Sequence, residues 1–140
     1  MRSNLPFINV YEKRSTKSKV ATQLLYGDTF KKIKNYGSWI KVKNDQDNYK
    51  GYIKNNKFLT NCVNTHKVFV LSSILYTKPN NKYKINKKLS FGSKIKVLKK
   101  KGDFFKFDSF WIKKKDLKKI NFQTKDTFKY IKNFINIKYK

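Results

Sequence analysis

The chain contains one sequence pattern twice. Shifted by 65 residues against itself, the sequence places glycine on glycine and apolar residue on apolar residue, without an insertion over the matching span. The aligned pairs are Tyr11 with Tyr76, Val20 with Ile85, Leu24 with Leu89, Gly27 with Gly92, Phe30 with Ile95, Ile33 with Leu98, Gly37 with Gly102, Trp39 with Phe104, and Val42 with Phe107. An internal repeat of this length predicts two small structural units of the same kind.

The repeated pattern predicts a hairpin with one buried face. In the first copy Ile40 and Val42 alternate with lysines, and in the second copy Phe105 and Phe107 stand in their places. Strict alternation indicates a half-buried strand. Glycines at fixed positions between such segments indicate turns that need a positive φ or a close approach of two chain segments. The sequence therefore predicts an all-β fold.

The length fits two small domains. A chain of 140 residues has room for one ordinary domain or two small ones, and the repeat favours two. We expect a first barrel over residues 1–60 and a second over residues 61–121. Residues 122–140 break the pattern, because apolar residues recur there at helical spacing after Thr124. This tail predicts a C-terminal amphipathic helix.

The charge of the chain is strongly positive. Its 35 Lys and Arg residues against 8 Asp and Glu residues give a formal net charge of +27, which predicts non-specific binding of polyanions at low salt. Only Arg2 and Arg14 carry the guanidinium group on which specific readers of nucleic acid depend. Two interpretations stay open: a solvated lysine surface produced by compositional drift, and a binding surface for anions.

Catalytic and metal-binding patterns are weak in this sequence. Cys62 is the single cysteine and His66 the single histidine. One cysteine forms no intrachain disulfide, and two ligands are fewer than the three that a zinc site needs from the protein. We expect no catalytic residue, no metal and no cofactor in this chain. A start without an apolar leader, and the lack of an apolar run of membrane-spanning length, predict a cytoplasmic protein without a transmembrane segment.

Four short motifs follow one another in a characteristic order. They are LPFINVYEK from Leu5, TQLLYGD from Thr22, DNYKGYI from Asp47 and THKV from Thr65. In this order they resemble the paired N-terminal bacterial SH3-like domains of NlpC-type murein peptide hydrolases, the γ-D-glutamyl-L-diamino acid endopeptidases also called dipeptidyl-peptidase VI. The resemblance implies two SH3-like barrels in tandem, over essentially the whole chain.

The tail extends this resemblance. In the family, the second barrel is followed by the first helix of a papain-like catalytic domain, and that helix leads into Trp-Gly-Gly. Here the sequence ends at Lys138-Tyr139-Lys140, where the Trp would come. Cys62 lies outside the Asp-Cys-Ser-Gly context of the family nucleophile. The resemblance therefore implies that this chain alone is not an enzyme, although its parent family is one of cysteine endopeptidases.

The resemblance also implies a set of substrate-binding residues. In the family, a Glu before Thr/Ser-Gln-Leu-Leu and the Tyr of Tyr-x-Gly-Trp/Tyr are suited to hold the free amine of a murein peptide. Tyr49 occupies the Tyr position, and Asp47 and Tyr52 lie in the same motif. Ala21 occupies the Glu position, so the charged partner is missing there. This departure implies relaxed specificity, or drift after loss of a catalytic half.

Two functions are expected from these observations. The first is a non-catalytic SH3-like module that positions or recognises peptidoglycan-derived peptides, with cell-wall association and a separately encoded catalytic domain as a further partner. The second is a basic protein that binds nucleic acid or another polyanion, in which lysines supply charge and exposed aromatic rings supply stacking.

Overall fold

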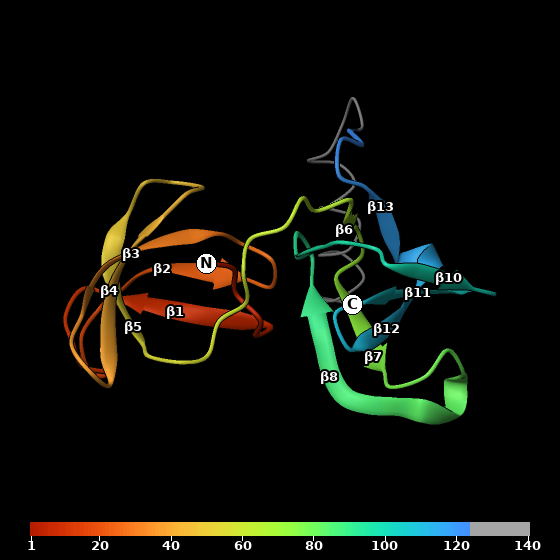
Figure 1. Cartoon of the computed structure of the whole chain (residues 1–140), viewed down its shortest axis with the longest axis horizontal. Helices are drawn as coiled ribbons and strands as arrows, with labels where there is room; N and C mark the ends of the chain where they lie inside the picture. The colour runs from red at the N-terminus through yellow and green to blue at the C-terminus, as the bar shows by residue number, and fades with distance from the viewer. Residues whose placement is uncertain (124–140) are drawn as a thin grey trace, which may run out of the picture. The chain divides into compact units, whose positions relative to one another are not determined.

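The structure, a computed structural model, describes residues 1–123 as an all-β chain of short strands (Figure 1). The strands are β1 (Phe7–Tyr11), β2 (Val20–Leu25), β3 (Phe30–Asn35), β4 (Trp39–Asn44), β5 (Lys50–Lys54), β6 (His66–Val68), β7 (Ser72–Tyr76), β8 (Lys84–Ser90), β9 (Lys94–Ile95), β10 (Lys99–Lys101), β11 (Phe104–Phe107), β12 (Phe110–Lys113) and β13 (Leu117–Lys119). Two single-turn 3-10 helices complete it, η1 (Asn81–Tyr83) and η2 (Lys114–Asp116). The predicted all-β class is confirmed for these residues, whereas the C-terminal helix predicted in residues 122–140 lies outside them.

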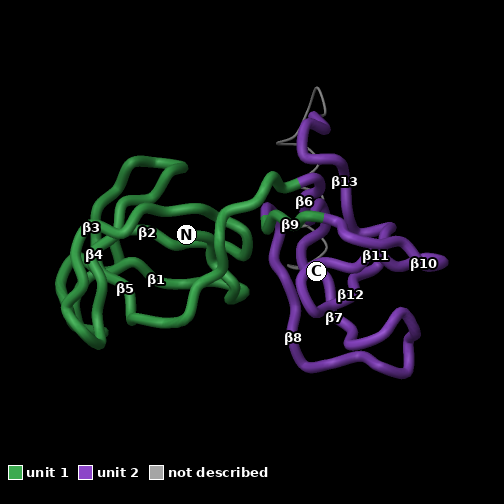
Figure 2. The backbone as a smooth tube through the Cα atoms, viewed as in Figure 1, with its two compact units in different colours: residues 1–64, 93–96 green, residues 65–92, 97–140 purple. Residues whose placement is uncertain are grey.

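The chain divides into two compact units, which are coloured separately in Figure 2. The first unit consists of Met1–Asn64 together with the short segment Ser93–Lys96. The second consists of Thr65–Gly92 and the chain from Val97 onward.

The first unit is built on a five-stranded antiparallel sheet. Its strand order is β2-β1-β5-β4-β3, so β1 and β5, the first and last of these strands in sequence, pair with each other inside the sheet. Ile40 and Val42 of β4 are buried, as their alternation with lysines predicts. The core contains Val10, Leu24, Phe30, Ile40, Val42 and Ile53, with Ile8 and Phe58 packed against it.

The second unit has a sheet with the corresponding strand order. The order β10-β11-β12-β7-β8, reversed, places β7 where β1 lies in the first unit, followed by β12, β11 and β10 where β5, β4 and β3 lie. A further antiparallel pair joins β6 to β13, with Leu117 opposite Val68. The buried apolar side chains of this unit are Val68, Phe69, Leu75, Tyr76, Leu89, Phe104, Phe105, Phe107, Ile112 and Leu117.

The repeated glycines occupy corresponding turns. Gly27 has φ +85° and its N–H donates to the carbonyl of Ser3 at 3.0 Å. Gly92 has φ +93° and its N–H donates to the carbonyl of Val68, also at 3.0 Å. Ser3 and Val68 are separated by the same 65 residues as the two glycines. Because a positive φ is costly for a residue with a Cβ, the sequence repeat marks a repeated backbone requirement.

Gly27 meets a second requirement, which is space. The N–H of Lys94 donates to the carbonyl of Tyr26 at 2.8 Å, and a Cβ on Gly27 would overlap the backbone oxygen of Lys94. The ammonium of Lys94 forms an ion pair of 2.8 Å with the carboxylate of Asp28, which also accepts a hydrogen bond of 2.8 Å from the N–H of Leu25. These contacts hold Ser93–Lys96 within the first unit.

One local expectation is wrong. Residues 55–59 resemble a single helical turn by sequence, but in the structure they form no helix. The side chain of Asn55 donates to the carbonyl of Gly37 at 2.7 Å, and the side chain of Asn56 accepts from the N–H of Lys57 at 2.7 Å. The bond between Asn56 and Lys57 is local and competes with helical backbone bonds, while the bond of Asn55 ties the segment to the distant turn at Gly37. In the second unit the turn does form, as η2.

Candidate functional site

An aromatic groove lies on the first unit, with a volume of about 640 Å³. Its residues come from three places in the sequence: the loop after β1, the turn between β3 and β4 with the start of β4, and the middle of β5. The residues that shape it are Glu12, Lys13, Arg14, Tyr36, Trp39 and Tyr52. We call this site the aromatic groove. Its volume falls in the range of about 300–1,000 Å³ that is usual for ligand pockets.

The turn between β3 and β4 holds the rings of the groove in place. The N–H of Tyr36 donates to the carbonyl of Trp39 at 2.8 Å, and the next residue, Gly37, has φ +86°. The side chain of Asn35 accepts a hydrogen bond of 2.8 Å from the N–H of Gly37, and the side chain of Asn55 donates to the carbonyl of Gly37. These hydrogen bonds stabilise the turn that carries the rings of Tyr36 and Trp39.

The rings of the groove contact one another and a guanidinium. Trp39 packs edge-on against Tyr11 with centroids 5.8 Å apart, and Tyr36 lies 6.0 Å from Tyr52. The guanidinium carbon of Arg14 lies 4.1 Å from the centroid of Tyr36. With Lys13 and Glu12 beside Arg14, the groove offers aromatic surface, two cations and one anion. This combination suits a peptide-like ligand that carries both amine and carboxylate groups.

The structure brings Asp47 and Tyr49 together in the loop between β4 and β5. The carboxylate of Asp47 accepts hydrogen bonds from the N–H of Tyr49 and from the hydroxyl of Thr22, both at 3.0 Å. Asn48 between them has φ +60°, which the short polar side chain tolerates. Tyr49 is 54% exposed, so its ring is accessible to a ligand. The Asp47 carboxylate thus contacts Thr22, which follows Ala21 at the position of the family Glu.

Tyr52, the third residue of the predicted set, belongs to the aromatic groove and not to this loop. It pairs with Lys41 across β4 and with Tyr11 across β1, and its ring faces Tyr36. Neither Asp47 nor Tyr49 lines the aromatic groove. The set predicted from the sequence therefore contains residues of two sites, Tyr52 in the aromatic groove and the pair Asp47 and Tyr49 in the loop between β4 and β5.

Sequence reasoning missed the contribution of Tyr36, Trp39, Glu12 and Arg14. Trp39 packs on Tyr11 and also lines the groove. A signal was present in the sequence. The rings of Tyr36 and Trp39 flank a glycine turn, and Arg14 is one of only two arginines in a chain of lysines.

Cys62 and His66 are not among the residues that line the aromatic groove. The thiol of Cys62 lies 3.7 Å from the side-chain oxygen of Asn64. Nδ1 of His66 lies 2.8 Å from the hydroxyl of Thr65, and its ring packs on Phe105 with centroids 5.1 Å apart. Burial, and secondarily the charge of Lys119, lower the pKa of His66 below its usual value. Within residues 1–123, no three His, Cys, Asp or Glu side chains gather in a way that could hold a metal ion.

The second unit has a pocket that contains the counterpart of Trp39. It has a volume of about 680 Å³ and includes Asp103 and Phe104, which align with Ser38 and Trp39. Phe104 packs edge-on against Tyr76, as Trp39 does against Tyr11. The other residues at this pocket are chiefly lysines. The edge-on ring pair is thus repeated, while Phe104 is surrounded by lysines where Trp39 is surrounded by further rings.

Comparison with known families identifies the first unit. The family model described as "Bacterial SH3 domain" matches residues 3–60, which are the five strands of the first sheet with their flanking segments. Residues 3–60 of this chain are therefore a bacterial SH3 domain, as the sequence motifs indicate. No curated protein matches the sequence.

Comparison with solved structures extends the likeness to most of the chain. The structure is similar to the crystal structure of an NlpC/P60 family protein from Bacillus cereus, with a TM-score of 0.73 and 14% sequence identity. The match covers 92% of this chain and 62% of that one, so this chain spans less than two thirds of the length of its structural relative. Together with the family match, this bears out the resemblance to the SH3-like domains of NlpC-type proteins.

The structure shows no helix in residues 1–123 that has both the length and the apolar character to span a membrane.

Proposed function

We propose that this chain is a non-catalytic binding module of a cell-wall hydrolase system, and that its first unit recognises peptidoglycan-derived peptides. The observation that carries the proposal is the aromatic groove, because it lies on the unit that is a bacterial SH3 domain. A murein peptide has a free amine, several carboxylates and little apolar surface. Glu12 and Arg14 complement the charged groups, and the Tyr36 and Trp39 rings provide flat contact area.

The loop of Asp47 and Tyr49 is proposed as a second contact for the same class of ligand. The two hydrogen bonds that Asp47 accepts fix its carboxylate, and each oxygen keeps a lone pair for a further donor. An ammonium group placed there meets one carboxylate and one phenol. Asp47 would thereby supply the negative charge that Ala21 does not.

The catalytic step, in this proposal, is supplied by a separate NlpC-type domain, either as a distinct partner chain or elsewhere in the system. The support is the structural relative, whose own chain is longer than the part matched here. The purified 140-residue chain is then expected not to cleave the peptide. Release of L-Ala-γ-D-Glu from a murein tripeptide by the homogeneous chain would contradict the non-catalytic assignment.

Binding itself is tested by calorimetric titration of the full chain with the peptide L-Ala-γ-D-Glu-diamino acid. Tyr36→Ala should weaken binding about five-fold or more, because it removes a ring on which Arg14 is stacked. The matched control is Tyr83→Ala in the second unit, whose ring carries a lysine in the same way, with Nζ 4.8 Å from the centroid. Equal effects of the two variants would exclude the aromatic groove as the binding site.

The loop contact is tested separately. Asp47→Asn keeps the size of the side chain and removes its charge, so it should weaken binding of a peptide with a free N-terminal amine and spare the N-acetylated peptide. Asp45→Asn removes a carboxylate from the same loop and serves as the control for net charge. The same loss with both peptides would show that Asp47 does not contact the amine.

A further inference from the structure

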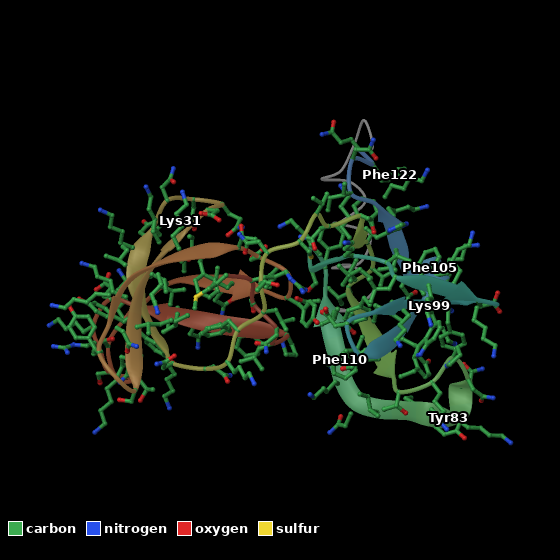
Figure 3. All side chains as sticks on the ribbon, viewed as in Figure 1. Lys31, Tyr83, Lys99, Phe105, Phe110 and Phe122 are labelled. Atoms are coloured by element: carbon green, nitrogen blue, oxygen red, sulfur yellow. The ribbon has the colours of Figure 1, made fainter. Side chains whose placement is uncertain are left out.

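A second pocket on the second unit differs in chemistry from the aromatic groove. It has a volume of about 630 Å³, and no carboxylate is among the residues that line it. Four lysines and two phenylalanines dominate its lining: Lys100, Lys114, Lys118, Lys119, Phe105 and Phe122. We call it the lysine pocket. Phe105, Phe122 and the neighbouring Lys99 are labelled in Figure 3, where lysine side chains extend outward around the strands.

The ring of Phe122 is held in place and remains partly exposed. The ring of Phe69 meets it edge-on, with centroids 5.3 Å apart. The ammonium of Lys67 donates a hydrogen bond to the carbonyl of Phe122. Phe69 is itself buried in the unit, so Phe122 rests on the core. An aromatic ring that is held on one side and exposed on another is suited to stack against a nucleic-acid base.

Lysine ammonium groups lie over these rings. Nζ of Lys118 lies 5.1 Å from the centroid of Phe122, and Nζ of Lys114 lies 5.8 Å from the centroid of Phe105. Cation–π contacts with an exposed lysine are weaker than a charge-assisted hydrogen bond to a phosphate oxygen. A phosphate would therefore draw Lys118 away from Phe122 and leave the face of that ring open to a second flat group.

Among residues 1–123, no carboxylate lines the lysine pocket. Asp116, although it follows Lys114 and Lys115 in sequence, is turned away, because its carboxylate accepts a hydrogen bond of 2.6 Å from the hydroxyl of Ser73. Asp103 lines a neighbouring pocket, which shares Lys114, Leu117 and Lys118 with the lysine pocket. The positive potential at the lysine pocket is thus available to an anion from solution.

We propose that the lysine pocket binds a nucleotide, either free or within a single strand of nucleic acid. The phosphate contacts Lys118 and Lys119, and the base stacks on Phe122. An anion without a flat group would use the lysines and leave the ring unused, whereas an apolar peptide would leave the lysines unpaired. A nucleotide uses both parts of the pocket.

The test uses the full chain, with His66 as a local probe. His66 lines the lysine pocket and is the only histidine of the chain, so its ring gives one imidazole signal in an NMR spectrum. In about 150 mM salt, thymidine monophosphate and an eight-residue oligothymidylate should both shift this signal in a saturable way, the octamer at lower concentration. Binding that leaves the His66 signal unmoved would place the ligand elsewhere and overturn the proposal.

Charge-matched variants separate this pocket from the general positive charge of the chain. Lys118→Gln with Lys119→Gln should weaken octamer binding about five-fold or more. Lys31→Gln with Lys32→Gln removes the same charge from exposed positions on β3 of the first unit and should change it less than about two-fold. Equal losses in both double variants would show that only the net charge acts.

A third variant tests the stacking contact. Phe122→Leu keeps an apolar side chain and the backbone carbonyl but removes the aromatic face. It should weaken octamer binding about five-fold or more while leaving the binding of inorganic tripolyphosphate unchanged. A parallel loss for both ligands, or no loss for either, would show that the pocket does not recognise a base.

Discussion

The two units of this molecule share a scaffold and differ in what they carry on it. Leu24 and Leu89 are fully buried in corresponding strands, and Gly27 and Gly92 take the same backbone conformation in corresponding turns. At exposed positions the agreement ends. Tyr36 of the first unit corresponds to Lys101 of the second, so a ring that lines the aromatic groove is replaced by a lysine.

This difference shows that the buried positions and the exposed positions of the repeat have followed separate constraints. A substitution in the core costs stability in either unit, because the packing around it is dense. A substitution on the surface changes only what the unit can bind. The comparison therefore predicts that substitutions at repeated, enclosed positions will destabilise the fold, and that substitutions at unshared positions will act on binding.

The largest effect is expected at Gly27. Gly27→Ala would force a Cβ against the backbone oxygen of Lys94 and also strain a positive φ, and we expect a loss of more than about 3 kcal/mol in the free energy of unfolding. Gly37 also has a positive φ, but a Cβ at this position would meet no other atom of the described residues. Gly37→Ala should therefore lower the free energy of unfolding by only about 1–2 kcal/mol. Denaturant unfolding, followed by Trp39 fluorescence in a Trp111→Phe background, measures both.

Equal losses for Gly27→Ala and Gly37→Ala would mean that the backbone conformation alone accounts for both glycines. The contact between Gly27 and Lys94 would then contribute nothing to the stability of the first unit.

A smaller effect is expected where the repeat places Asp28 in one copy and Ser93 in the other. The carboxylate of Asp28 is bonded to Lys94 and to the N–H of Leu25, whereas the hydroxyl of Ser93 is buried without a hydrogen-bond partner among the described residues. Asp28→Asn should cost about 1–3 kcal/mol. The NH₂ group of the amide would have to face either the Lys94 ammonium or the Leu25 N–H, and both of these are donors. Ser93→Ala should be neutral or slightly stabilising.

Chemical denaturation compares these two variants directly. A loss for Ser93→Ala as large as that for Asp28→Asn would reveal a partner of the serine hydroxyl that the described contacts do not include.

A further effect, on binding, is expected when Trp39 of the aromatic groove is exchanged for the residue type of its counterpart in the second unit. Trp39→Phe gives the first unit the ring that the second unit has as Phe104, and should weaken binding of the murein peptide by about 1 kcal/mol, which is about five-fold. Trp111→Phe makes the same change on β12 of the second unit and should leave peptide binding within about two-fold. Calorimetric titration of both variants is the measurement. A larger effect from Trp111→Phe would move the peptide site to the second unit.

How far the sequence could predict this structure depends on the kind of position. The alternation of Ile40 and Val42 with lysines, and the spacing of Gly27 and Gly92, follow from strand and turn geometry and are readable without a structure. The absence of a helical turn at Asn55 is not readable in this way, because it results from a hydrogen bond to Gly37 far back in the sequence.

The candidate site was predictable in part for the same reason. Asp47 and Tyr49 are neighbours in sequence and could be grouped correctly. Tyr52 could not be separated from them, since alternation along β5 places it against Tyr11 and Tyr36, which come from other strands and turns. Contacts between distant segments decide which side chains share a groove, and the sequence pattern carries no direct record of them.

The smallest predicted effect concerns His66, which has an apolar counterpart, Met1, in the repeat. Burial and then the charge of Lys119 lower its pKa, and the lysine pocket adds Lys100, Lys114 and Lys118 on neighbouring elements. The Thr65 hydroxyl accepts a hydrogen bond of 2.9 Å from the N–H of Val97, which leaves its own proton free to donate to Nδ1 of a neutral ring. Because the unfolded chain binds the proton more readily than the folded chain, the contribution of neutral His66 to stability is complete above about pH 6.5. It is lost as the pH falls through the lowered pKa.

The denaturation midpoint of the second unit, followed by Trp111 fluorescence in a Trp39→Phe background, should therefore fall slightly more between pH 7 and pH 5 in the natural chain than in His66→Gln. Parallel profiles would show that protonation of His66 is not linked to folding.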